Sequence, residues 1–261
     1  MFTHSISNIL VRTEESHMQE NKQMTKVEVN NPIQAASEIF YKPTSVFLAL
    51  SVKDNWSWIP FILIMVILFI PPYLYFGLVD FNWWLDVAIM PNFEDMPPSQ
   101  QENMLAQYSP TQMQLTAGLS SSLLLALIYA IKAFYFSMMT RNDEKSVQGF
   151  TDWYGAMWWI AMPMLSNALI SLILLTLQEP GAQISGAILA PLSLAFILGI
   201  DMASPWFNLL VDLRLDVLWS IWLGYVCVKS WTHFSQTKAL ITACIPATVI
   251  WIFLIVFAVV A

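Results

Sequence analysis

Long apolar runs recur along this chain, and they limit its fold more than any other feature. The clearest runs cover residues 56–78, 114–139, 153–177 and 239–261. A helix of about twenty apolar residues crosses the hydrocarbon core of a bilayer, which is about 30 Å thick. Such a helix also satisfies its backbone polar groups internally. The sequence therefore predicts an all-α integral membrane protein.

The composition supports this class and excludes others. Hydrophobic residues make up 57% of the 261 residues and charged residues only 11%, whereas soluble domains carry about a quarter charged residues. The net charge of −7 argues against nucleic acid as a partner. Both cysteines, Cys227 and Cys244, lie in apolar runs, and His4, His17 and His233 are scattered. We therefore expect no disulfide, no metal site and no cofactor.

Residues 1–30 differ from the rest of the chain because they are polar and mixed in charge. Such a composition is typical of a disordered segment, so we expect a cytoplasmic tail followed by one membrane domain over residues 31–261. Met24 is an alternative start, which would remove residues 1–23 from the protein. N-terminal mass spectrometry would decide between Met1 and Met24.

A semi-apolar stretch, residues 31–55, precedes the first span. Asn31 and Pro32 are typical of a helix start, and Pro43 ends that helix. Apolar side chains recur at helical spacing at Ile33, Ala36, Ile39 and Phe40, and again at Val46, Phe47 and Leu50. Both pieces are too short to span. We expect an N-terminal amphipathic segment that lies on the membrane surface or packs against the cytoplasmic ends of the bundle.

Two shorter segments decide the number of spans. Residues 185–200 are interrupted by Pro191, and residues 211–230 are long enough only if the charged stretch before Leu215 contributes. If only residues 211–230 span, all of the 11 Lys and Arg residues except Arg214 lie on the cytoplasmic side. If both segments span, Lys229 and Lys238 move outside in exchange for Arg214, which fits the positive-inside rule less well. We expect a five-transmembrane-helix bundle with a cytoplasmic N-terminus, an outside C-terminus and a re-entrant or interfacial helix at 185–200.

Three charges, Asp212, Arg214 and Asp216, open the fourth span. One interpretation is structural: the acids stabilise the positive end of a helix dipole at the headgroup level, and Arg214 extends to the surface. In the other, Asp216 faces the bundle interior as a polar anchor or ion ligand. On one continuous helix Asp212 and Asp216 would share a face.

A second polar pair, Ser166 and Asn167, follows Pro163 inside the third span. Interhelical hydrogen bonding is one role for this pair, and a permeation or ligand role is the other. Lys132, late in the second span, is expected to anchor that helix at the cytoplasmic surface. The sequence has no catalytic constellation or phosphate-binding loop, so we expect no enzyme.

Three stretches of the chain resemble the Yip1 family of small polytopic membrane proteins, in its bacterial branch. They read "NPIQAASEIFYKPTSVFLALSVKDNWSWIP", "YGAMWWIAMPMLSNAL" and "LDVLWSIWLGYVCVKSW", the last followed by "TKALITACIPATVIWIF". The resemblance implies five spans, a cytosolic N-terminus and an outside C-terminus. Eukaryotic relatives act in vesicle traffic with small GTPases and oligomerise, a role that does not transfer to a bacterial cell, and no functional residue is carried over.

Two functions follow as hypotheses. The first is a non-enzymatic scaffold that organises membrane lipid, other membrane proteins or copies of itself in the bacterial cytoplasmic (inner) membrane. The alternative is a small transporter or channel with a site near Asp216 and Asn167, favoured by the broken apolar segment at Pro191 and the intramembrane polar residues.

Overall fold

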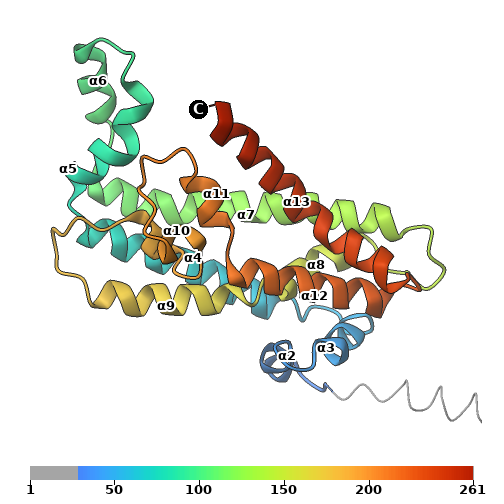
Figure 1. Cartoon of the computed structure of the whole chain (residues 1–261). Coiled ribbons are helices and arrows are strands. Elements are labelled where there is room, and N and C mark those ends of the chain that lie inside the picture. The colour runs from blue at the N-terminus through green and yellow to red at the C-terminus, as the bar shows by residue number, and fades with distance from the viewer. Residues whose placement is uncertain (1–28, 261) are drawn as a thin grey trace, which may run out of the picture.

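The computed structural model describes residues 29–260, and regular structure in this part of the chain is helical (Figure 1). The α-helices are α2 Pro32–Glu38, α3 Pro43–Leu50, α4 Trp58–Leu78, α5 Phe81–Trp84, α6 Pro98–Leu105, α7 Pro110–Thr140, α8 Phe150–Ile160, α9 Met164–Thr176, α10 Leu194–Ile197, α11 Phe207–Asp212, α12 Leu215–Trp231 and α13 Gln236–Val260. A π-helical turn, Leu85–Ile89, and two 3-10 turns, Met90–Phe93 and Gly186–Leu189, complete the helical elements. Pairing of β type is limited, over residues 29–260, to two isolated bridges. The predicted all-α class is confirmed, while most of the predicted tail and the alternative start Met24 lie outside the described residues.

Four helical stretches are long and apolar enough to cross a membrane: α4, α7, α8 together with α9 (Phe150–Thr176), and α13. They coincide with the four clearest predicted spans. The predicted fourth span, 211–230, differs from the structure because its helix, α12, begins only at Leu215 and has 17 residues. Residues before Leu215 belong to a separate short helix, α11. The count of five spans therefore depends on whether α12, together with the residues before it, crosses the membrane.

The long helices lie roughly side by side (Figure 1), with α4 packed on α7 and α9, and α12 packed on α13 and α3. Gly118 permits the close approach of α7 to α4, because a Cβ atom at this position would come within 2.9 Å of the Phe69 Cα atom. This agrees with the small-residue faces that membrane helices use to pack closely.

The densest part of the core is aromatic, and we call it the tryptophan end, after Trp153, Trp158, Trp159 and Trp231. The ring centre of Trp153 lies 4.7 Å from that of Trp231 and 5.2 Å from that of Phe136, on which it stacks. Aromatic pairs at these separations add to the free energy gained by burying the rings. The tryptophan end therefore joins α7, α8 and α12.

The helices α2 and α3 pack against this end (Figure 1). Trp231 donates a hydrogen bond from its indole Nε1 to the carbonyl oxygen of Phe47 at 2.7 Å, and the side chains of Val46 and Phe47 are buried. The N-terminal segment was predicted either to lie on the membrane surface or to pack against the bundle. The apolar face of α3 packs against the bundle. Ile33, predicted on the apolar face of the first helix, is instead exposed, because α2 turns Ala35 and Glu38 inward.

Residues 185–200 do not form one short helix. Gly186–Leu189 is a 3-10 turn, Leu194–Ile197 is a single helical turn, and between them Ser193 pairs with Arg214 in an antiparallel bridge. Pro191 has no N–H group and interrupts the helical pattern, and the backbone finds partners in another segment. We call residues 185–214, which include this bridge, the irregular end.

Candidate functional site

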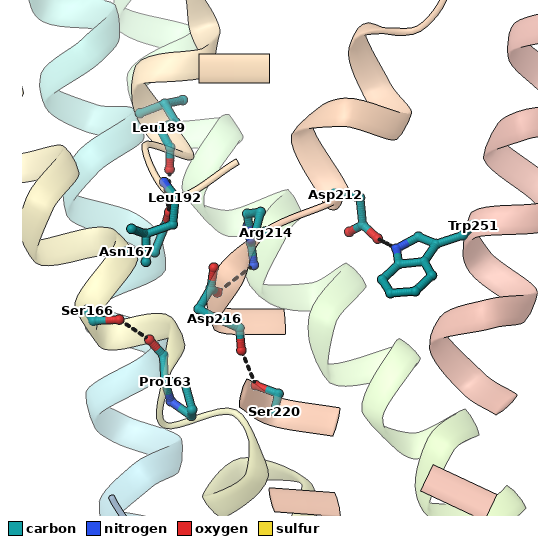
Figure 2. Close-up of polar contacts among 10 residues, drawn as sticks. All are labelled: Pro163, Ser166, Asn167, Leu189, Leu192, Asp212, Arg214, Asp216, Ser220 and Trp251. Carbon is teal, nitrogen blue, oxygen red and sulfur yellow. Dashed lines mark hydrogen bonds and ion pairs between the residues drawn. The ribbon is translucent and has the colours of Figure 1, made fainter. Parts of the chain in front are cut away.

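Asn167 holds the irregular end to α9. Its side-chain Nδ2 donates to the carbonyl oxygen of Leu189 at 3.1 Å, and its Oδ1 accepts from the backbone N–H of Leu192 at 3.2 Å, as Figure 2 shows. The two bonds bracket Pro191. A buried amide side chain is suited to this task because it presents a donor and an acceptor together.

Ser166, the other member of the predicted pair, has a local role. Its hydroxyl donates to the carbonyl oxygen of Pro163 at 2.6 Å, within the same chain turn (Figure 2). Asn167 therefore makes the hydrogen bonds to another element, the 3-10 turn Gly186–Leu189 and the residues after it, and Ser166 satisfies a carbonyl at the start of α9.

Backbone pairing with residues 192–194 separates α11 from α12. The Leu194 N–H donates to the Leu213 carbonyl oxygen at 3.0 Å, and the Leu215 N–H donates to the Leu192 carbonyl oxygen at 3.2 Å. Arg214 between them is extended. This pairing satisfies backbone groups that would otherwise be left open inside an apolar bundle.

The break changes the predicted relation of the two acids. Asp212 is the last residue of α11 and Asp216 lies in the first turn of α12, so they do not share a helical face. Asp212 instead accepts a hydrogen bond from the indole Nε1 of Trp251 on α13, at 2.9 Å (Figure 2). Asp212 therefore connects α11 to α13.

Arg214 and Asp216 form an ion pair in which Arg214 Nη2 lies 3.1 Å from Asp216 Oδ2 (Figure 2). The Asp216 side chain is only 2% exposed and that of Arg214 17%. Asp216 stands in the first turn of α12, and its side chain is buried in the protein. Asp216 Oδ1 and Arg214 Nε are buried and have no hydrogen-bond partner.

Two residues of α7, Tyr129 and Lys132, interact electrostatically with these charged side chains. Tyr129 is within electrostatic range of Arg214 and Asp216, and Lys132 of Asp212 and Arg214. Lys132 Nζ lies 5.7 Å from the centre of the Tyr129 ring, one turn earlier on the same helix. The sequence feature that could have indicated this interaction is the single lysine, Lys132, inside the apolar run 114–139.

We call Lys132, Asp212, Arg214 and Asp216 the charged cluster. Its two cations and two acids sum to zero, so a low-dielectric interior accepts it more readily than any one of its charges alone. Its unpartnered atoms give it capacity to bind a further polar group. Over residues 29–260 no group of three or more His, Cys, Asp or Glu side chains is placed to hold a metal ion.

Comparison with known proteins places this chain within a family. The family model described as Yip1 domain matches residues 37–258, which include α3 to α12, all but the last two residues of α13, and the whole charged cluster. No curated protein and no solved structure matches the chain significantly.

Proposed function

The chain belongs to the Yip1 family, and from that premise we propose that this integral, multi-pass membrane protein is a non-enzymatic scaffold that organises membrane proteins or lipid. Its site of action is the bacterial cytoplasmic membrane. The proposed arrangement has five spans, with α12 as the fourth, a cytoplasmic N-terminus and an outside C-terminus.

The distribution of charge along the molecule supports this orientation. Basic residues belong to the connections and helix termini next to the tryptophan end: Lys42, Lys53, Arg141, Lys145, Lys229 and Lys238. Asp143 accepts a hydrogen bond from the His233 N–H at 3.0 Å, which brings the connection after α7 beside the connection after α12. Positive residues gather on the cytoplasmic side of membrane proteins, which supports a cytoplasmic tryptophan end.

The length of α12 is compatible with a fourth crossing. Its 17 residues make a helix about 25 Å long at the usual rise per residue. The chain before α12 consists of the extended residue Arg214, the non-helical Leu213 and the helix α11. Together these elements supply the remaining length that a bilayer of about 30 Å requires.

The observation that carries the scaffold proposal is the exposure of α13. Only 17% of its most apolar stretch is buried, slightly less than the 22% of α4 and of α7 and well below the 50% of α8 with α9. Its outer half extends away from the other long helices (Figure 1). Large apolar side chains are exposed there on several sides: Ile252, Phe253, Val256, Phe257 and Val260. Such a helix offers a broad apolar surface to another membrane protein, to a second copy or to lipid.

Photo-crosslinking in the native membrane tests this proposal. A p-benzoylphenylalanine at Phe253, on α13, is expected to give a covalent adduct with a second, differently tagged copy or with a membrane protein identified by mass spectrometry. The matched control is the same probe at Phe134, which is similarly exposed on α7 and is expected to react with lipid only. Monomer alone from both positions would rule out the scaffold.

A conduit is the second candidate, and the charged cluster favours it. Asp216 is buried with an unpartnered oxygen, and buried ionisable groups in membrane helices commonly mark ion or solute paths. Flux through liposomes containing the wild type and Asp216→Asn tests this candidate. Equal permeability of protein-containing and empty liposomes to a panel of ions and small solutes would eliminate it.

A further inference from the structure

A small aliphatic cavity lies where the irregular end meets α12. Its volume is about 150 Å³, and its lining comes from α10 and from residues on both sides of the break between α11 and α12. Five leucines and Ile197 form the wall, and Arg214 is the only polar residue among the described residues that line it. Ile197, Leu215 and Leu218 are also exposed on the outer surface of the protein, so the cavity adjoins the surface that faces lipid.

Arg214 has hydrogen-bonding capacity that the protein leaves unused. A guanidinium has five N–H donors in a planar fork. One nitrogen, Nη2, bonds to Asp216, and Nε has no partner, while 17% of the side chain stays exposed. The ion pair with the almost fully buried Asp216 holds one edge of the guanidinium, and Arg214 also lines the cavity. Nε itself is buried, so an external acceptor reaches the guanidinium through the exposed part of the side chain.

The residues that line the cavity determine which kind of ligand it can bind. An aliphatic wall next to lipid accepts a methylene chain and disfavours a hydrated ion. The planar fork of arginine matches the oxygens of a phosphate group. We propose that this cavity binds a membrane glycerophospholipid, with the phosphodiester on Arg214 and part of an acyl chain against the leucines.

The neutrality of the charged cluster adds a prediction about selectivity. Because Lys132 and Arg214 are balanced by Asp212 and Asp216, the cluster exerts little long-range attraction on an anionic headgroup. Recognition therefore depends on the phosphodiester, which phosphatidylglycerol and phosphatidylethanolamine share. The two lipids are expected to bind with similar affinity.

This proposal requires that α12 is embedded in the bilayer, but it does not require self-association. A negative crosslinking result at Phe253 would remove the scaffold and leave the lipid site untouched. Loss of lipid binding would in turn leave any crosslink at Phe253 in place.

Native mass spectrometry of the delipidated full-length protein in detergent tests the site with four probes: phosphatidylglycerol, phosphatidylethanolamine, diacylglycerol and inorganic phosphate. One phospholipid is expected to bind, and diacylglycerol and inorganic phosphate are each expected to bind at least about tenfold more weakly, since each lacks one of the two contacts. Equal binding of diacylglycerol would overturn the role of Arg214. Equal binding of inorganic phosphate would overturn the role of the leucine wall.

Two variants locate the site. Leu218→Trp fills the cavity without changing a charge, and Arg214→Gln removes the guanidinium; each is expected to weaken phospholipid binding by about tenfold or more. Leu123→Trp, the same change at an exposed position on α7, is the control and is expected to leave binding unchanged. Thermal unfolding identifies any variant that fails to fold. Undiminished binding by a folded Leu218→Trp protein would refute the proposal, whatever Arg214→Gln does.

Discussion

At the tryptophan end, Trp153 is fully buried between Phe136 and Trp231, whereas at the irregular end Asn167 and residues 213–215 hold an interrupted backbone by hydrogen bonds. The first region gains stability from apolar area, which is insensitive to direction. The second depends on directed bonds that fail when one partner is lost. Continuous helices suit the first kind of contact, and a segment that cannot stay helical requires the second. The two ends should therefore respond differently to mutation.

The largest effect is expected from Trp153→Ala at the tryptophan end. Removing a fully buried tryptophan leaves a cavity and should lower the free energy of unfolding by about 3–5 kcal/mol. Thermal or SDS-induced unfolding of the detergent-solubilised protein measures the loss. Leu127→Ala, at an exposed position on α7, is the control, and an equal loss in both variants would contradict the account of this core.

Asn167→Leu should have the next largest effect, and a more local one. The change leaves the Leu192 N–H and the Leu189 carbonyl without their partner, at a cost of about 1–3 kcal/mol. Hydrogen exchange at the Leu192 amide should accelerate, while exchange in α8 stays as it was. Ser166→Ala, which removes only a bond within the same turn, should leave the Leu192 amide protected.

Trp251→Phe should cost about 1 kcal/mol, within the range of hydrogen bonds inside membrane proteins. It removes the bond to Asp212, one of the contacts between α11 and α13. Electron–electron distance measurements between spin labels at Leu124 and Phe253 should show a broader distribution. The control is Trp222→Phe, at an exposed tryptophan of α12, and an unchanged distribution in Trp251→Phe would show that the bond does not position α13.

Tyr75→Phe should give the smallest effect, about 0.6 kcal/mol. The Tyr75 hydroxyl donates to the carbonyl oxygen of Ile184 at 2.9 Å, just before the irregular end. Faster hydrogen exchange confined to the residues that follow Ile184 would agree with this role. Tyr73→Phe, at an exposed tyrosine of the same helix, is the matched control. Identical exchange in the two variants would show that the Tyr75 hydroxyl bond does not protect these residues.

The parts that could be predicted from sequence are those that depend on local pattern. Long apolar runs located the four stretches long enough to span, and Asn31 and Pro32 located the start of α2. Each signal lies within one segment, so no knowledge of its neighbours is required.

The parts that were missed depend on contacts between distant segments. Neither Leu213 nor Arg214 is a glycine or a proline, the residues that commonly end a helix. The break between α11 and α12 arises instead from backbone pairing with residues 192–194. Tyr75 is buried, and its hydroxyl bonds to the carbonyl oxygen of Ile184, more than a hundred positions away. The electrostatic interaction of Lys132 with Asp212 likewise joins two different helices, which no single-segment pattern describes.

The bridge between Ser193 and Arg214 also has a consequence for how the protein is made. Residues 192–194 emerge from the ribosome before residues 213–215, their backbone partners, have been translated. Until then their N–H and C=O groups need water, because lipid offers no substitute. If α12 crosses the membrane as proposed, we expect release of this region from the translocation channel to wait for α12, with residues 186–231 entering the bilayer as one folded unit.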